Sequence, residues 1–340
     1  MRLKLSLELL GLLVLAALIA VMPRLVGDFT AYEFATVGTY FIALLGLAIL
    51  TGYGGQISLG HGAFMAIGGY TTAILSVDGI YGHQLRDLWT IPLAGLIAGL
   101  GGLLVGLPAL RLSGLYLALI TFGIAVSFPE LPKKFDKFFG GTTGKVLNLV
   151  HAPYGLNTSP DNWIYYLTWS IAFVLLVAAW LLLRGKPGRA LQAIRDSEVA
   201  AASSGVSLAR YKTLAFGISA FYAGVAGSLY VIARAYMNPD VFPIILSLYL
   251  VAALAVGGLD SLVGLIAGAA VIYVLENRPE DVTRWINHLP AISLNAKRPG
   301  MPSVVFGAVL IIFMIVLPSG VGGFLRRLFG PLTNRLYSRS

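Results

Sequence analysis

Long apolar stretches without Asp, Glu, Lys or Arg alternate with short charged segments along the whole chain. These charge-free stretches are 9–23, 34–77, 88–110, 112–129, 162–183, 213–233, 241–259, 261–275 and 299–325. Most approach or exceed the length of about 20 residues that a helix needs to cross a bilayer. The stretch 34–77 has room for two spans, divided by the turn-like residues from Thr51 to Gln56. The pattern therefore predicts an all-α polytopic membrane protein with about ten transmembrane helices, forming a single domain over 1–340.

The composition supports this class. Hydrophobic residues make up 57% of the chain and charged residues 11%, whereas soluble domains contain about 25% charged residues. The chain has no cysteine, which excludes disulfides, thiolate catalysis and thiolate metal sites. A disordered protein is excluded, and an ordinary soluble enzyme is disfavoured.

The net charge of +9 is interpreted as a topology signal, because Lys and Arg favour cytoplasmic loops. Basic residues cluster in the polar loop 184–212 and in the tail 319–340. If both segments are cytoplasmic, ten spans place both termini inside and the loops 130–161 and 276–300 outside. The inside then holds 13 basic and 4 acidic residues. Anionic membrane lipid is the expected electrostatic partner, and nucleic acid is not, because the basic-aromatic motifs are absent.

A short internal repeat suggests how the spans are arranged. The sequence Gly-Leu-Ile-Ala-Gly occurs at 95–99 and again at 264–268. Five predicted spans separate the copies, so they would run in opposite directions, as in a five-plus-five inverted repeat of a transporter. The alternative is two independent faces of small residues that allow close helix packing.

Motifs for catalysis or cofactor binding are not found. Gly140-Gly-Thr-Thr-Gly-Lys145 differs from a phosphate loop, because Phe139 stands at the first glycine position and Val146 follows the lysine. The four histidines have no metal-ligand spacing, and no G-x-S-x-G elbow is present. We expect no catalytic residue, cofactor or metal. The predicted spans are also nearly free of ionisable residues, the main exception being Asp260 in the link between two of them, which argues against a proton-coupled carrier.

Two segments are candidates for function. In the loop 184–212, the residues from Asp196 to Gly205 predict a short helix, with Asp196 or Ser197 as the N-cap, Glu198 in the first turn and Gly205 as the stop. This helix is either a docking element for a partner or a plain connector. In the second segment, polar residues with glycines on either side either line an aqueous path or join helices by hydrogen bonds. These polar residues are Gln56, Ser58 and His61.

Four stretches carry a resemblance to a known family. Residues 188–201 and 205–230 resemble the cytoplasmic loop and following helix of branched-chain amino acid ABC transporter permeases, M-type subunit. Residues 50–64 and 253–264 match the same family in the same order. Two departures are that 140–145 lacks the acidic or amide residue usual in this external loop, and that the distal Ile-x-Leu-Pro of the wider ABC-permease pattern is missing.

The resemblance implies a multi-pass permease subunit of an ATP-driven importer for branched-chain amino acids in the bacterial inner membrane. Its implied partners are a sibling permease, two ATP-binding subunits that hydrolyse ATP, and a periplasmic solute-binding protein. The residues implied to couple to the ATPase are Arg195, Asp196, Ser197, Glu198, Val199, Ala200 and Gly205. The same importer with urea, short amides or aromatic acids as cargo is an alternative. An ion-coupled carrier or channel working alone is another, and a membrane-embedded enzyme is the least favoured.

Overall fold

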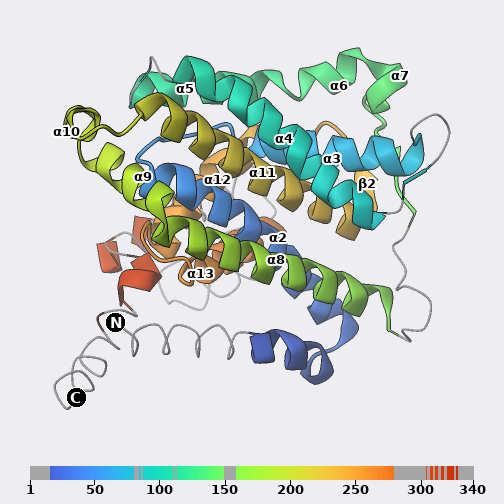
Figure 1. Ribbon diagram of the computed structural model, residues 1–340. Helices are drawn as coiled ribbons and strands as arrows, with labels where there is room; N and C mark the ends of the chain where they lie inside the picture. Colours follow the sequence, from blue (N-terminus) through green and yellow to red (C-terminus); the bar gives the residue numbers. More distant parts are fainter. Residues whose placement is uncertain are drawn as a thin grey trace.

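The computed structural model describes residues 16–79, 84–85, 87–109, 112, 114–148 and 158–278, and scattered positions between 304 and 327. The described chain is a bundle of helices (Figure 1). Its helices are α2 (Asp28–Leu47), the π-helix η1 (Ala48–Tyr53), α3 (His61–Val77), α4 (Asp87–Ala109), α5 (Leu115–Ser127), α6 (Glu130–Lys134), α7 (Asp136–Phe139), α8 (Pro160–Arg184), α9 (Lys186–Asp196), α10 (Glu198–Ser203), α11 (Leu208–Arg234), α12 (Ile244–Gly257) and α13 (Leu265–Asn277). A two-residue strand β1 (Lys145–Val146) pairs antiparallel with β2 (Tyr236–Met237).

Among the described residues, five helical segments are long and apolar enough to cross a membrane. They are Asp28–Tyr53, Leu88–Pro108, Leu115–Lys134, Pro160–Arg184 and Leu208–Arg234. Shorter apolar helices lie at Ala16–Leu25, Ile244–Gly257 and Leu265–Asn277. The prediction of an all-α polytopic membrane protein is confirmed. The predicted count of ten spans includes segments outside the described residues and stays a prediction.

Helices α2 and α11 form the centre of the bundle and are the most deeply buried of the long helices. Helix α11 packs on α2, α3 and α4, and glycines allow its backbone to approach α3 closely. A methyl group added at Gly227 would overlap the carbonyl of Met65, and one added at Gly68 would overlap the backbone of Gly224. Because lipid gives helices no hydrophobic reason to associate, such small-residue contacts are a principal way to hold a membrane bundle together.

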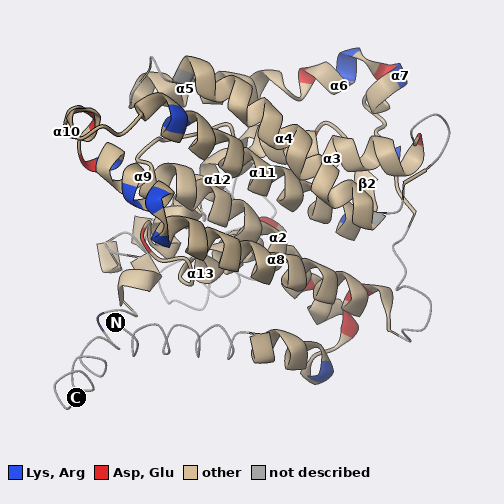
Figure 2. Cartoon of the chain, viewed as in Figure 1, with Lys and Arg blue, Asp and Glu red and all other residues tan. Residues whose placement is uncertain are grey.

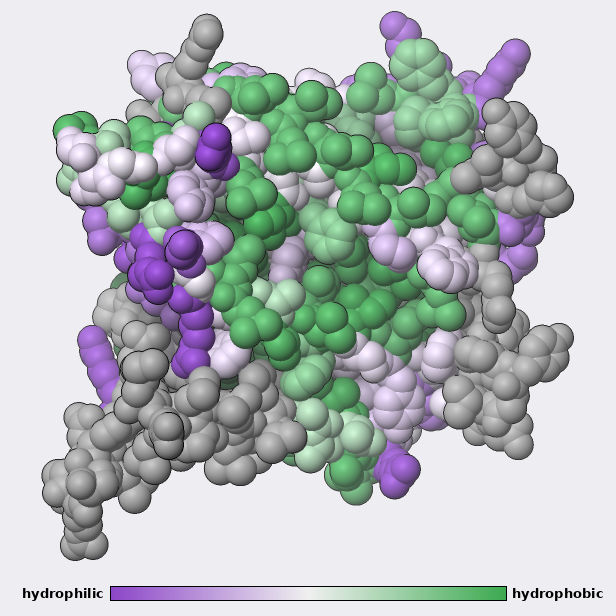
Figure 3. All heavy atoms as spheres, viewed as in Figure 1, coloured by the Kyte–Doolittle hydropathy of each residue, from purple (hydrophilic) through white to green (hydrophobic). Residues whose placement is uncertain are grey.

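Charged side chains gather at the two ends of the bundle. Lys and Arg surround α9 and α10 at one end, and charged residues of both signs mark α6, α7 and the first turns of α2 and α8 at the other (Figure 2). Between these ends the visible face is largely apolar (Figure 3). Helices α4 and α5 expose several leucines, among them Leu96, Leu100, Leu104, Leu115 and Leu119. This distribution fits a protein whose middle faces hydrocarbon.

The predicted loops contain more structure than expected. The segment 184–212 forms two helices, α9 and α10, and 130–161 contains α6, α7 and β1. Helix α13 continues through Asn277, so it extends two residues into the loop predicted at 276–300. Most of the predicted tail 319–340 lies outside the described residues.

Candidate functional site

The α9–α10 segment projects from the basic end of the bundle (Figure 1). Helix α9 is amphipathic and buries Leu191 and Ile194. The chain then turns at Ser197, whose side-chain oxygen accepts a hydrogen bond of 3.3 Å from the amide of Ala200. Ser197 is therefore the N-cap of α10, and Asp196 instead ends α9. The predicted stop is present too, since Gly205 has a left-handed φ of +82°.

A buried lysine ties α10 to the long helix α11. The Nζ atom of Lys212 donates to Oε1 of Glu198 over 2.7 Å. The Lys212 side chain is 4% exposed and that of Glu198 is 45% exposed. Because a buried ammonium is costly without a partner, this bond fixes the first residue of α10 against α11.

The rest of α10 faces outward. Only Ala201 is buried among its residues, while Val199 is 79% exposed and Ala200 is also exposed. Val199 lies at the α9 end of the bundle, outside the apolar zone. An apolar side chain that is so exposed there is suited to a contact with another protein.

Arg195, the residue before the end of α9, joins three segments of the chain. Its Nη1 donates to the carbonyl oxygen of Gly52 over 2.7 Å and to Oδ1 of Asp260 over 2.9 Å. The hydrogen bond to Asp260 raises the pKa of the guanidinium above its usual value, so Arg195 stays charged. The hydroxyl of Tyr53 donates to the backbone carbonyl of Asp260 over 3.2 Å, which binds η1 to the same link.

The stretch 34–77 is divided as predicted, but the break lies at residues 54–60, later than the predicted 51–56, because the π-helix η1 continues through Tyr53. Gln56 lies within this break, where its amide donates to the carbonyl of Leu50 over 3.1 Å and its carbonyl accepts from the Thr51 hydroxyl over 2.9 Å. The side chain of Gln56 is buried, and neither its Oε1 nor its Nε2 has a hydrogen-bond partner among the described residues. It is thus a polar group available to a ligand or to water.

Side chains from α5 and α12 satisfy the backbone where α3 begins. The hydroxyl of Thr121 accepts from the amide of Leu59 over 2.9 Å, and that of Ser247 accepts from the amide of Gly62 over 3.0 Å. Ser58 is fully buried in this region. Non-helical backbone at membrane depth is tolerated where protein surrounds it or a water-filled cavity adjoins it, and these contacts meet that requirement.

His61, the first residue of α3, is fully buried. Its Nε2 lies 2.9 Å from the carbonyl oxygen of Ala43. A carbonyl only accepts, so Nε2 carries the proton and Nδ1 is an acceptor, which has no partner among the described residues. Ala43 precedes Tyr53 by ten residues, about 15 Å along a helix, so the break runs from the α9 end into the bundle. The buried side chains of Gln56 and Ser58 in the non-helical segment 54–60 and of His61 at the start of α3 therefore follow one another from the α9 end into the bundle.

An ionisable group that the sequence reasoning placed in a loop is instead part of a helix. Glu276 lies in the last turn of α13, and the hydroxyl of Tyr40 on α2 donates to its Oε2 over 2.6 Å. Arg234 at the end of α11 donates to Oδ1 of the neighbouring Asn277 over 2.9 Å. Helix α13 therefore ends with a carboxylate that lies outside the charge-free stretch predicted as a span. Glu276 directly follows the charge-free stretch 261–275, which was the available signal.

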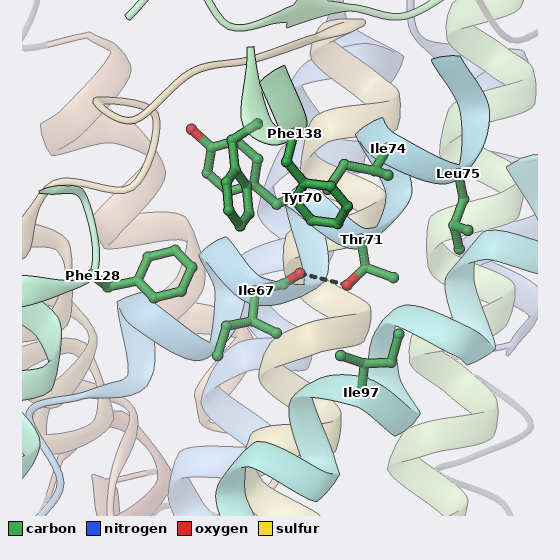
Figure 4. A pocket seen from close by; sticks show the side chains of 9 residues that line it. Ile67, Tyr70, Thr71, Ile74, Leu75, Ile97, Phe128 and Phe138 are labelled. Carbon is green, nitrogen blue, oxygen red and sulfur yellow. Dashed lines mark hydrogen bonds between the residues drawn. The ribbon is translucent and has the colours of Figure 1, made fainter. Parts of the chain in front are cut away.

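A cavity of about 300 Å³ lies between α3, α4, α7 and the end of α5 (Figure 4). Its lining is almost wholly apolar and includes Phe128 and Phe138. The Thr71 hydroxyl donates its hydrogen bond to the carbonyl of Ile67 over 2.8 Å, so its proton is not available to a ligand in the cavity. With no charged side chain among its nine lining residues, this cavity suits hydrocarbon better than a zwitterion.

The apolar bundle defines a multi-pass membrane protein, and sequence comparison defines its family. Residues 30–314 match the family described as branched-chain amino acid transport system / permease component. The chain belongs to this family.

Individual relatives agree with this assignment. The chain is 31% identical to the high-affinity branched-chain amino acid transport system permease protein LivM of Escherichia coli, over 94% of this chain and 75% of the relative. It is 30% identical to LivM of Salmonella typhimurium, over 83% of this chain and 67% of the relative. The permease protein LivH of Salmonella typhimurium is 23% identical, over 84% of this chain and 91% of the relative. No solved structure matches the chain at a significant level.

Proposed function

We propose that this protein is a permease subunit of an ATP-driven importer that carries branched-chain amino acids across the bacterial inner membrane. The observation that carries the proposal is the match of residues 30–314 to the permease family. Two structural features support it. Helix α10 projects from the α9 end of the bundle, and the buried polar break at 54–60 starts at the same end.

The similarity to both LivM and LivH supports a pair of related permeases as the membrane part of the importer. Two ATP-binding subunits and a periplasmic solute-binding protein complete the assembly. Helix α10 docks on an ATP-binding subunit, using the exposed Val199 and Ala200, while Ser197, Glu198 and Gly205 fix its ends and Arg195 and Asp196 join it to the bundle.

The topology of the proposal has about ten spans, with both termini and the α9–α10 end in the cytoplasm. The small-residue sequences at 95–99 and 264–268 mark the corresponding helices of two inverted halves. The basic groups around α9 and α10 (Figure 2) support the orientation, because such groups favour the cytoplasmic side. Anionic lipid would contact the same groups.

The break at 54–60 forms part of the translocation path. Its support is the pair of orphaned buried groups, the Gln56 amide and Nδ1 of His61, which can exchange hydrogen bonds with water or cargo. Because the side chain of a branched-chain amino acid is apolar, few polar groups suffice in transit, and selection then rests on the binding protein.

The test is reconstitution of the complete importer in liposomes with labelled L-leucine. Uptake that requires ATP, the binding protein and both permeases is expected. Competition by L-valine and L-isoleucine, and not by urea, short amides or aromatic acids, would establish the cargo. Leucine uptake by this chain alone, driven by an ion gradient without the ATP-binding subunits, would contradict the proposal.

A further inference from the structure

The end of η1, the end of α9 and the α12–α13 link meet in direct contact, although they lie far apart in the sequence. A methyl group added at Gly52 would overlap the carbonyl of Leu259. Gly55 has a left-handed φ of +67°, and a Cβ there would lie 2.8 Å from Cγ of Arg195. The three segments are therefore packed backbone against backbone or side chain, with no room between them.

Arg195 is the polar centre of this junction. The carbonyl of Gly52 lies at the end of a helix, where backbone acceptors lack intrahelical donors. The same Nη1 of Arg195 that satisfies this carbonyl also bonds Asp260. A planar guanidinium can hold a carbonyl and a carboxylate at once in a fixed geometry, which a lysine ammonium does less well.

The junction lies between the two parts of the candidate site, which are helix α10 and the break at 54–60. Only Asp196 and Ser197 separate Arg195 from α10. On the other side, Gly52 is followed within four residues by the orphaned Gln56. Arg195 is therefore the shortest side-chain connection that the structure shows between α10 and the start of the break.

We propose that Arg195 and Asp260 are positioning residues that transmit the movement of α10 to the break at 54–60. The inference rests on the proposed function, because it needs an ATP-binding subunit to move α10. The Arg195 and Asp260 side chains are 34% and 57% exposed. Since pairs that exposed contribute little to folding stability, their value lies in geometry, and variants should fold.

The experiment measures movement of the break directly. The chain has no cysteine, and Ile57 in the break is 44% exposed, so Ile57→Cys gives a single reactive position. Its modification by a charged methanethiosulfonate is followed by mass spectrometry of this chain, in the full importer complex in nanodiscs. Rates are compared without nucleotide and with trapped ATP, beside L-leucine uptake per ATP hydrolysed.

The comparison uses Asp260→Asn and Arg195→Lys against Asp78→Asn. Asp78, whose side chain is 43% exposed, forms an ion pair of 2.6 Å with Lys145, which is 9% exposed, and thus controls for loss of an ion pair elsewhere in the chain. The ATP-dependent change in the rate at position 57 is expected to disappear in the Asp260 and Arg195 variants, with leucine uptake per ATP reduced several-fold. The Asp78 variant should keep both.

Two results would overturn the inference while leaving the importer function intact. One is normal leucine uptake with an unchanged response at position 57 in both junction variants. The other is normal uptake by the Ile57→Cys protein, otherwise unsubstituted, with no response of position 57 to ATP. Failure of the unsubstituted complex to take up leucine would instead contradict the proposed function.

Discussion

Nε2 of His61 donates a hydrogen bond of 2.9 Å to the carbonyl oxygen of Ala43, which joins the first residue of α3 to the C-terminal part of α2. The other ring nitrogen, Nδ1, has no partner among the described residues. Nε2 therefore stabilises the packing of α3 on α2, whereas Nδ1 can accept a hydrogen bond from water or cargo in the proposed translocation path.

Two amide substitutions separate these roles. His61→Gln can place its amide nitrogen near Nε2, and so should keep the bond to Ala43 and the thermal stability of the wild type. His61→Asn is shorter and loses that bond, at a cost of about 1 kcal/mol. We expect His61→Gln to lower leucine uptake without lowering stability, since its amide oxygen does not occupy the position of Nδ1. Wild-type uptake by His61→Gln would remove His61 from the path.

The ion pair of Glu198 with Lys212 predicts the effect of reversing its charge. Glu198→Lys places two ammonium groups together, one of them buried, and should reduce ATP-driven uptake by roughly tenfold or more, because losing such a bond costs about 1–3 kcal/mol. Membrane insertion should be unaffected. Unchanged uptake by this variant would contradict a coupling role for Glu198.

The double variant Glu198→Lys with Lys212→Glu restores an ion pair of opposite polarity. We expect it to recover a substantial part of the uptake, because the carboxylate of Glu198 acts by holding α10 on α11. No recovery, in a protein of normal stability, would indicate that the ATP-binding subunit itself recognises the negative charge.

A charge at the exposed position of Val199 should weaken docking of the ATP-binding subunits. Val199→Asp introduces a charge into a side chain that touches little of its own chain, so the folded permease should be as stable as the wild type. The ATP-binding subunits should co-purify in much lower yield. Val146→Asp is the matched control, since Val146 is also largely exposed but lies in β1. Equal recovery of the subunits with both variants would contradict docking at α10.

The close approach of α11 to α3 predicts a large stability effect from one methyl group. Gly227→Ala would overlap the carbonyl of Met65 and should cost about 1–3 kcal/mol, as overpacking does. Gly123→Ala is the control, because nothing lies within 4 Å of the added methyl group. Thermal unfolding in detergent should show a clear loss for the first variant alone.

Local features were the most predictable from the sequence. The glycines after Thr51 indicate a break, and the structure places it at 54–60. The short helix and its stop at Gly205 follow from capping preferences. Asp196 and Ser197 are equally good caps by type, and only the continuation of α9 through Asp196 decides between them.

Contacts between distant positions could not be predicted in this way. Arg195 and Asp260 are 65 positions apart, and no spacing rule relates them. The charge of Glu276 predicts the end of a span, whereas α13 continues through Asn277. A helix end can keep a carboxylate when a hydroxyl such as that of Tyr40 meets it. In each case the partner, supplied by tertiary packing, determines the role of the residue.

Helix α13 and the link that precedes it contact α2 and η1 at two places. At one of them, Arg195 donates hydrogen bonds to both Gly52 of η1 and Asp260 of the α12–α13 link. At the other, the Tyr40 hydroxyl bonds Glu276, and Arg278 pairs with Glu33 of α2. Contacts near both ends constrain α2 and α13 against sliding past each other, so we expect the two helices to move together. In the proposed transport cycle, we then expect the change of access to occur between this pair and its neighbours, with the distance between α2 and α13 unchanged.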